Sequence, residues 1–448
     1  HVLFRRQRQM CIRDRSHNFA EIIDMLGSNS GYLNIDSFDQ VQFDLQNPNR
    51  VVGEGDTFRY NFNIDANVLS GFAQAQFKYN KVDFFLAGSY TATEYQREGL
   101  YQTETYADNS IGKGRKLTFG GVGAKGGFTY KFSGKHIFNV NAGYLTKAPS
   151  IRNTFTNSRE NHAIVGDITG IDITEEKITS FDANYIFRSS AVKARLTGYC
   201  IQMKDANEIS FYFADGISGV DEGTAFVQEI LQGIDKTHVG IEFGMEAQIT
   251  PSIKLTGVAS LGQFTYDNNP NLVLTSSDFV DGLNFGESNL KDYRIAAGPQ
   301  QAASIGFEYR DPNYWWFGTT ANFFADTYVD VSPLTRTQNF FLDTDGLPFS
   351  DYEPDLAREL LRQERFEDYM VINAIGGKSW KIGDKYISLF VSLNNIFNQK
   401  FKSGGFEQGR SANYRSLQED AGNPKRVFGP KYWYGRGPTY FLNLNYRF

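Results

Sequence analysis

Residues 236–250 read KTHVGIEFGMEAQIT, and apolar and polar side chains alternate along this stretch with a period of two. An α-helix would scatter the apolar residues around its circumference, whereas a β-strand places all of them on one face. The stretch therefore predicts a strand with one apolar face, formed by Val239, Ile241, Phe243, Met245, Ala247 and Ile249, and one polar face, formed by His238, Gly240, Glu242, Gly244, Glu246 and Gln248.

The same alternation recurs through the chain and ends at the last residue, where Tyr440, Leu442, Leu444, Tyr446 and Phe448 share one face. We expect about thirteen strands between Ser70 and Phe448, each roughly as long as the 9–11 residues that a tilted strand needs to cross a bilayer. Short polar turns alternate with long segments at 94–114, 147–174, 206–236, 267–298, 328–367 and 399–437. This arrangement is typical of a transmembrane antiparallel β-barrel, so the predicted fold class is all-β.

The composition agrees with such a barrel. Aromatic residues make up 15% of the chain and prolines number only 12, a mixture that favours strands. The mean hydropathy of -0.42 and the lack of a continuous apolar run exclude a helical membrane protein. A net charge of -6 argues against a nucleic-acid-binding protein. Two cysteines, Cys11 and Cys200, provide neither a disulfide framework nor a metal knuckle.

The start of the chain departs from this pattern. Residues 1–15, HVLFRRQRQMCIRDR, contain five arginines and no apolar core of the kind that a signal peptide requires. We interpret them as an adapter-like artefact, or else as a disordered tail, and residues 16–69 as an extracellular loop with the remnant of a strand. Within this region the apolar residues move from even positions, such as Phe62, to odd positions, such as Ala73. A slip of one residue reverses the two faces of a strand, so a bulge or a turn is expected near Val68 to Gly71.

No grouping of residues predicts catalysis, a metal site or a cofactor. The five histidines have no zinc-binding spacing, and no GxSxG motif marks a nucleophile. The acidic loop that contains Asp343, Asp345 and Asp351 could bind calcium, although a solvated loop explains it more simply. We therefore expect a protein that is not an enzyme.

Five segments, met in this order along the chain, resemble motifs of the TonB-dependent outer-membrane receptors: YLTKAPSIRNTF (144–155), TEEKITSFDANYIF (174–187), HVGIEFGMEAQIT (238–250), VSLNNIFNQKF (391–401) and the terminal YFLNLNYRF (440–448). The family barrel has 22 strands and a plugged lumen. The resemblance implies that residues 70–448 are the C-terminal part of such a barrel, about 13 of its 22 strands, and that the plug domain is absent from this sequence.

The resemblance also implies a function and partners. The protein would import a scarce nutrient (a siderophore, vitamin, oligosaccharide or peptide) across the gram-negative cell outer membrane. A TonB-type energy-coupling complex would act through the plug region. Further implied partners are outer-membrane lipid, lipopolysaccharide and the barrel insertion machinery, for which Phe448 would be the terminal signal. A passive porin or channel and an adhesive barrel remain alternatives.

Two sets of residues are candidates for function. Polar side chains expected to face the lumen are Lys193, Arg195, Glu242, Glu246 and Arg447. Loops carry recognition in such proteins, and aromatic rings and arginines suit ring faces and anionic groups. In the last extracellular loop we therefore expect ligand contacts from Arg410, Tyr414, Arg415, Tyr432, Trp433 and Arg436. No nucleic acid is expected to bind.

Overall fold

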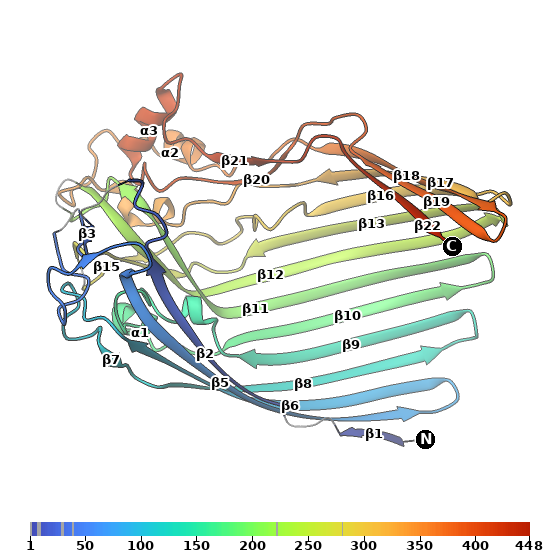
Figure 1. Ribbon diagram of the computed structural model, residues 1–448, viewed down its shortest axis with the longest axis horizontal. Coiled ribbons are helices and arrows are strands. Elements are labelled where there is room, and N and C mark those ends of the chain that lie inside the picture. Colours follow the sequence, from blue (N-terminus) through green and yellow to red (C-terminus); the bar gives the residue numbers. More distant parts are fainter. Residues whose placement is uncertain (1, 7–9, 28–30, 38–39, 221–222, 280) are drawn as a thin grey trace.

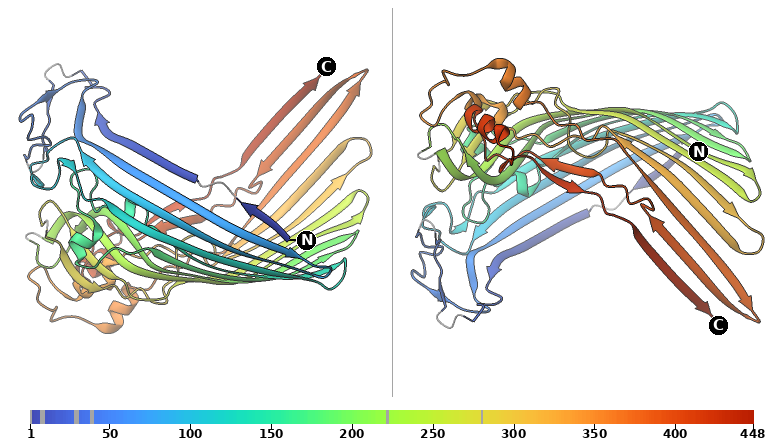
Figure 2. Two further views of the ribbon diagram at one scale, coloured as in Figure 1. Left: turned by 90° about the horizontal axis from the view of Figure 1, so that it is seen from below. Right: turned by 90° about the horizontal axis from the view of Figure 1, so that it is seen from above.

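Each long strand of the chain pairs antiparallel with the next, which bends one large sheet into an open trough (Figures 1 and 2). The computed structural model describes residues 2–6, 10–27, 31–37, 40–220, 223–279 and 281–448. In these residues no ladder joins β22 to β2, so the two edges of the sheet stay apart. The main ladder runs in the order β2 (Met10–Glu21), β5 (Thr57–Lys78), β6 (Val82–Gly99), β8 (Leu117–Lys131), β9 (His136–Lys147), β10 (Glu176–Arg188), β11 (Val192–Asp215), β12 (Thr224–Thr250), β13 (Ile253–Tyr266), β16 (Gln301–Arg310), β17 (Trp315–Ala325), β18 (Tyr369–Ile382), β19 (Lys385–Asn394) and β22 (Thr439–Arg447).

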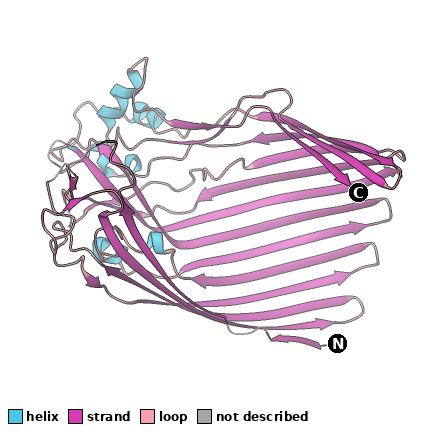
Figure 3. Cartoon of the chain, in the orientation of Figure 1, coloured by secondary structure: helices cyan, strands magenta, loops and turns pink. Residues whose placement is uncertain are grey.

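The described helices and most short strands gather at one end of this sheet, whereas tight turns join the long strands at the other end, where the short strand β1 (Val2–Arg6) also lies (Figures 1 and 3). The helices are α1 (Val165–Thr169), α2 (Pro354–Leu360) and α3 (Tyr414–Gly422), with 3-10 turns at Ile151–Asn153, Leu334–Arg336 and Gln338–Phe341. No helix among the described residues has the length and apolar character needed to span a membrane. The remaining strands are β1 (Val2–Arg6), β3 (Tyr32–Leu33), β4 (Val51–Val52), β7 (Gly112–Lys113), β14 (Asn271–Thr275), β15 (Leu283–Glu287), β20 (Lys402–Phe406) and β21 (Lys431–Tyr434).

The long strands have one apolar and one polar face, and the apolar face is uncovered. Ile241 of β12 and Leu261 of β13 are cross-strand partners, and Ile305 of β16 lies opposite Gly257 on the same face of β13. Their exposed fractions are 55%, 58% and 73%. A soluble protein of this size would bury such a surface. The buried apolar clusters lie instead among the loops, at the end of the strands where the helices gather. The predicted all-β class is therefore confirmed, whereas the count of about 13 strands out of an expected 22 stays a prediction.

The described part of residues 1–15 lies in β1 and β2. β1 and β2 both pair with β5, along different parts of the same edge. Our interpretation of these residues as adapter sequence stays a prediction. In the expected 16–69 region the structure shows the end of β2, the small hairpin of β3 and β4, and the first part of β5.

The expected bulge or turn near Val68 to Gly71 is wrong. β5 pairs with β6 without a register shift from Phe62 to Lys78, so its faces never slip there. The bulge lies earlier, where the pairing with β2 shifts and Arg59 takes a positive φ of 72°. Phe62 is apolar on the otherwise polar face because it packs under the 147–173 loop, against Phe155 and Ile164.

The expected long loop at 206–236 is also wrong. β11 and β12 continue far beyond the sheet as one hairpin, paired up to Asp215 and Thr224. Asp205 and Gly233 take positive φ angles at the base of this extension, where the register shifts. Loops cover its surfaces, so the extension contributes Ile209 and Ile230 to one cluster and Val227 to another.

Candidate functional site

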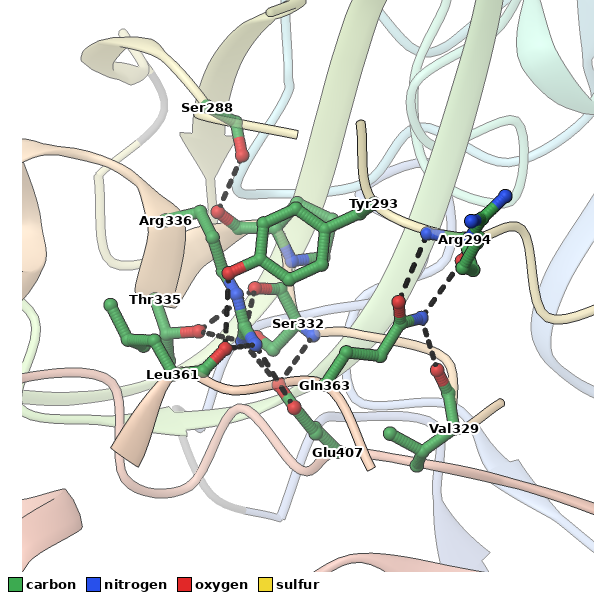
Figure 4. Close-up of polar contacts among 11 residues, drawn as sticks. Ser288, Tyr293, Arg294, Val329, Ser332, Thr335, Arg336, Leu361, Gln363 and Glu407 are labelled. Atoms are coloured by element: carbon green, nitrogen blue, oxygen red, sulfur yellow. Dashed lines mark hydrogen bonds and ion pairs between the residues drawn. The ribbon is translucent and has the colours of Figure 1, made fainter. Parts of the chain in front are cut away.

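Three loops at the structured end of the sheet meet around one buried arginine. They are the segments between β13 and β16 (267–300), β17 and β18 (326–368), and β19 and β22 (395–438). Arg336, in the middle segment, has a side chain that is 2% exposed. It lies at the centre of the polar contacts in Figure 4. We call these contacts the Arg336 hub.

The guanidinium of Arg336 is fully engaged on its two terminal nitrogens. Nη1 donates to the Oε2 of Glu407 and to the hydroxyl of Thr335 at 2.6 Å. Nη2 donates to Glu407 Oε1 at 3.0 Å and to the carbonyl of Leu361 at 2.9 Å. Burial alone would disfavour the charged guanidinium, but the Glu407 carboxylate outweighs it and raises the pKa of Arg336. A buried, paired charge of this kind joins loops that are far apart in sequence.

Further bonds extend the hub to the first loop. Tyr293 lies under the guanidinium, 5.2 Å from it, and donates its hydroxyl to the carbonyl of Leu361 at 3.0 Å. Gln363 accepts from the backbone N–H of Arg294 at 2.9 Å and donates to the carbonyls of Arg294 and Val329. All three loops are thus held in one arrangement by groups that water cannot reach easily.

A cleft of about 810 Å³ lies beside the hub, and Thr335, Gln363 and Glu407 of the hub form part of its wall. Helices α2 and α3 supply much of the remainder. The arginines of the cleft are Arg362, Arg365 and Arg426. Arg365 is paired with Asp326 and Asp368, and Arg426 with Asp420. Arg362 is exposed, and its guanidinium forms no ion pair or hydrogen bond with the residues that the structure describes.

A family profile matches most of this chain. The profile described as TonB dependent receptor-like, beta-barrel matches residues 12–396. The chain belongs to this receptor family. No curated protein matches the sequence.

Solved structures that resemble this receptor chain include two receptors and one transporter. The siderophore receptor PiuA from Acinetobacter baumannii superposes with a TM-score of 0.57 at 10% identity, over 97% of this chain and 51% of that one. The ferric-catecholate import receptor Fiu from K12 E. coli gives 0.55 at 12% identity, over 97% and 50%. The copper transporter OprC gives 0.55 at 12% identity, over 97% and 52%. The likenesses establish a shared fold, and this receptor chain spans about half the length of each.

The predicted ligand contacts of the last loop lie apart from one another in the receptor. Arg410 pairs with Asp215 at 2.7 Å and packs between two phenylalanine rings. Tyr414 is fully buried in a loop cluster with Phe340, so it holds the loop together. Arg415 pairs with Asp351 at 2.9 Å. None of these three lines the cleft.

The other predicted contacts lie on β21, which pairs with β20, or just after it. Tyr432 donates its hydroxyl to Glu364 of the cleft at 2.6 Å, and the ammonium of Lys402 lies 3.5 Å from its ring centre. Trp433 is 58% exposed. Arg436 contributes its backbone carbonyl to Asn395. A ligand role for all six residues stays a prediction.

The predicted lumen residues share the polar face of the sheet. Lys193 pairs with Glu246 at 3.3 Å across β11 and β12. Arg195 and Glu242 line a hollow of about 520 Å³ on this face. Arg447 lies opposite Tyr386 near the end of β22. Phe448 follows β22 and is 93% exposed, and its role as an insertion signal stays a prediction.

Sequence reasoning missed the residues that build the hub and the cleft. A usable signal was the stretch 353–368, EPDLARELLRQERFED, whose apolar residues recur at helical spacing after a proline. It forms α2 and the Arg362–Arg365 segment. The acidic loop at 343–355 holds no metal-type cluster among the described residues, so the calcium reading gains no support.

Proposed function

We propose that this chain is part of an outer-membrane importer for a scarce nutrient, and that the cleft beside the Arg336 hub takes part in binding that nutrient. The observation that carries the proposal is the asymmetry of the sheet. Its apolar face is uncovered along the strands, while one end bears ordered loops with a charged cleft. Such an arrangement suits a barrel that spans a membrane and recognises molecules at one side.

The ordered loops favour a receptor over a passive porin. A channel needs loops that leave its mouth open, whereas here the hub fixes three loops against one another through a buried ion pair. Buried polar networks of this kind hold one conformation. Preorganised loops lower the entropy cost of binding a ligand.

The cleft suits a polar ligand with anionic groups. Arg362 is exposed, and the other two arginines are held in place by carboxylates. Arginine presents a planar fork of donors that matches carboxylate or phosphate oxygens. The neighbours named above are a siderophore receptor, a ferric-catecholate receptor and a copper transporter. Within the classes predicted from the sequence, an anionic siderophore-type chelate fits best.

The test is uptake by cells that carry the native gene product. Accumulation of radiolabelled ferric chelates is measured in cells with and without this gene, and with and without the TonB-type complex. We expect accumulation to require both. Accumulation that persists without the energy-coupling complex would favour the passive channel instead.

A pair of variants on neighbouring turns tests the cleft. Arg362→Ala is expected to weaken binding by about tenfold or more, because one charge-assisted hydrogen bond contributes about 1.5–3 kcal/mol, or roughly 10- to 150-fold in affinity. Arg358→Ala is the matched control, since Arg358 lies outside the cleft, is 76% exposed and pairs only with Asp355. Equal binding by the two variants would remove the cleft from the proposal.

A further inference from the structure

A large hollow lies on the apolar face of the sheet, away from the loops. It has a volume of about 1110 Å³ and crosses five strands, from β5 to β10. Its floor consists of small residues on the apolar face: Ala73, Ala75, Gly88, Ala124, Gly126 and Ala142. Larger side chains, Leu86, Tyr144 and Phe181, border it and are 61%, 41% and 49% exposed. We call this hollow the outer groove.

The outer groove runs obliquely with respect to the ends of the strands. At the β10 end, Thr179 lies nine residues from Arg188, where β10 reaches the tight turns. At the β5 end, Ala73 lies five residues from Lys78, where β5 reaches the same side. The β10 end is therefore higher by four residues, or roughly 9 Å for tilted strands that rise about 3.3 Å per residue. The groove descends from the loop side toward the middle of the sheet.

Two lysines lie just above the higher end of the groove. Lys177 is two residues beyond Thr179 on β10, and it is the direct cross-strand partner of Lys204 on β11. It is eleven residues from Arg188, or roughly 27 Å along the barrel axis, which matches the height of about 25 Å of an outer-membrane apolar band. Both lysines are thus placed where lipid headgroups begin.

The charges at this point are incompletely balanced. Like charges directly opposite each other destabilise a strand pair. Lys177 is relieved by Asp205, at 2.7 Å, whereas no described residue forms an ion pair with the side chain of Lys204. Tyr144, at the border of the groove, is the cross-strand partner of Thr179, two residues from Lys177 on the same face. A phosphate placed here would pair with the ammonium of Lys204 and would share the ammonium of Lys177 with the carboxylate of Asp205.

We propose that the outer groove and this lysine pair form a binding site for a phosphorylated lipid of the outer leaflet, such as the lipid A part of lipopolysaccharide. One acyl chain lies in the groove, where the small residues leave room for it. The phosphate lies between Lys177 and Lys204. The site depends on the apolar face meeting hydrocarbon, and it does not depend on what the protein imports.

The experiment measures lipid binding to the native gene product in nanodiscs by native mass spectrometry. The probes are purified lipid A and phosphatidylcholine. We expect lipid A to bind at least tenfold more tightly than phosphatidylcholine. The double variant Lys177→Gln with Lys204→Gln is expected to lose this preference, and the double variant with Arg at both positions is expected to keep it. Equal binding of the two lipids by the unmodified protein would overturn the proposal.

Matched controls separate this site from general contact with lipid. Ala124→Phe fills the groove and is expected to weaken lipid A binding about tenfold. Ala374→Phe makes the same change on the apolar face of β18, outside the groove, and is expected to leave binding unchanged. Lys378→Gln removes a lysine from β18 whose ammonium donates a hydrogen bond to the carbonyl of Asn313 in the turn. This variant is also expected to leave lipid A binding unchanged. Equal losses in the groove variants and in their controls would overturn the proposal.

Discussion

Replacing Glu407 by glutamine tests the Arg336 hub most directly. The carboxylate accepts bonds from both terminal nitrogens of Arg336 and from the backbone N–H of Ser332, the last at 3.0 Å. Glutamine retains one acceptor oxygen but removes the charge and presents an amide N–H to a positive group. Breaking a buried ion pair by neutralising one partner costs about 3–5 kcal/mol. We take about 3 kcal/mol, because Glu407 is 18% exposed and one acceptor survives.

The loss is expected in the loops and not in the whole sheet. A local cost of about 3 kcal/mol raises the population of the opened loops roughly a hundredfold. Hydrogen exchange of the native gene product in detergent, followed by mass spectrometry, measures this opening peptide by peptide. Peptides from 326–368 and 399–437 are expected to exchange faster, and peptides from β9 and β10 are expected to be unchanged.

A control and a double variant make the result decisive. Glu419→Gln removes a carboxylate from the exposed surface of α3 and is expected to change stability by less than about 0.5 kcal/mol. A double-mutant cycle of Glu407→Gln and Arg336→Met measures the coupling free energy between the two side chains, since the double variant removes both partners together. If Glu407→Gln alters exchange no more than Glu419→Gln, or if the coupling is near zero, the ion pair does not hold the loops.

The other predictions concern the membrane face and two buried titratable groups. Met245→Arg, on the apolar face of β12, is expected to lower the free energy of unfolding by about 2–4 kcal/mol, measured by urea unfolding in lipid. Thr256→Arg, on the polar face of β13, should lower it little. Equal losses would contradict the assignment of the two faces. Burial, aided by a nearby arginine, lowers the pKa of His162, so the folded loops favour the neutral ring. These loops should therefore lose stability as the pH falls below about 6.5. His162→Gln should remove this pH dependence from the hydrogen-exchange rates of the loops. Burial raises the pKa of Glu229 to about 7, so its contribution is complete below about pH 4.5 and lost as the pH rises to about 7. The exchange rate of the β11–β12 extension should therefore increase across that range, and Glu229→Gln should flatten the curve.

The strands were predictable because their environment repeats. Every second side chain of a crossing strand meets hydrocarbon, so alternation alone placed Ile241 on one face and Glu242 on the other. The family motifs added the order of the strands, and the profile match confirms the family. Alternation carries no information about closure of the sheet or about how far a hairpin such as β11–β12 rises above the membrane.

The site was not predictable in the same way. Arg336 and Glu407 are separated by 71 residues, and neither belongs to a pattern that repeats. Their pairing depends on how three loops fold together, which no local preference encodes. Aromatic and basic content drew attention to the last loop, yet content cannot distinguish Tyr414, which is buried in the loop cluster, from Trp433, which is exposed.

The behaviour of β5 shows what the alternation actually reports. Between Leu69 and the tight turn, Ala73, Ala75 and Phe77 face outward, and Phe72 is the one large apolar residue that faces inward. On the loop side of Leu69, Phe62 and Ile64 face inward, although the strand is continuous. The outward side chains there are polar, and Asn67 bonds to Glu94 at 2.9 Å. The two sides of the sheet have exchanged environments, because water lies outside and packed loops lie inside.

This exchange locates the edge of the membrane. Leu69 is nine residues from Lys78 at the tight-turn end of β5, which amounts to roughly 22 Å of height for a strand tilted by about 40° that rises about 3.3 Å per residue. An outer-membrane apolar band is about 25 Å tall, so the reversal falls where the hydrocarbon should end. A slip in register would have no reason to occur at that height. When the apolar residues of a long barrel strand change from one face to the other, the edge of the hydrocarbon is therefore a better explanation than a bulge. Lys177 on β10 lies at about the same height.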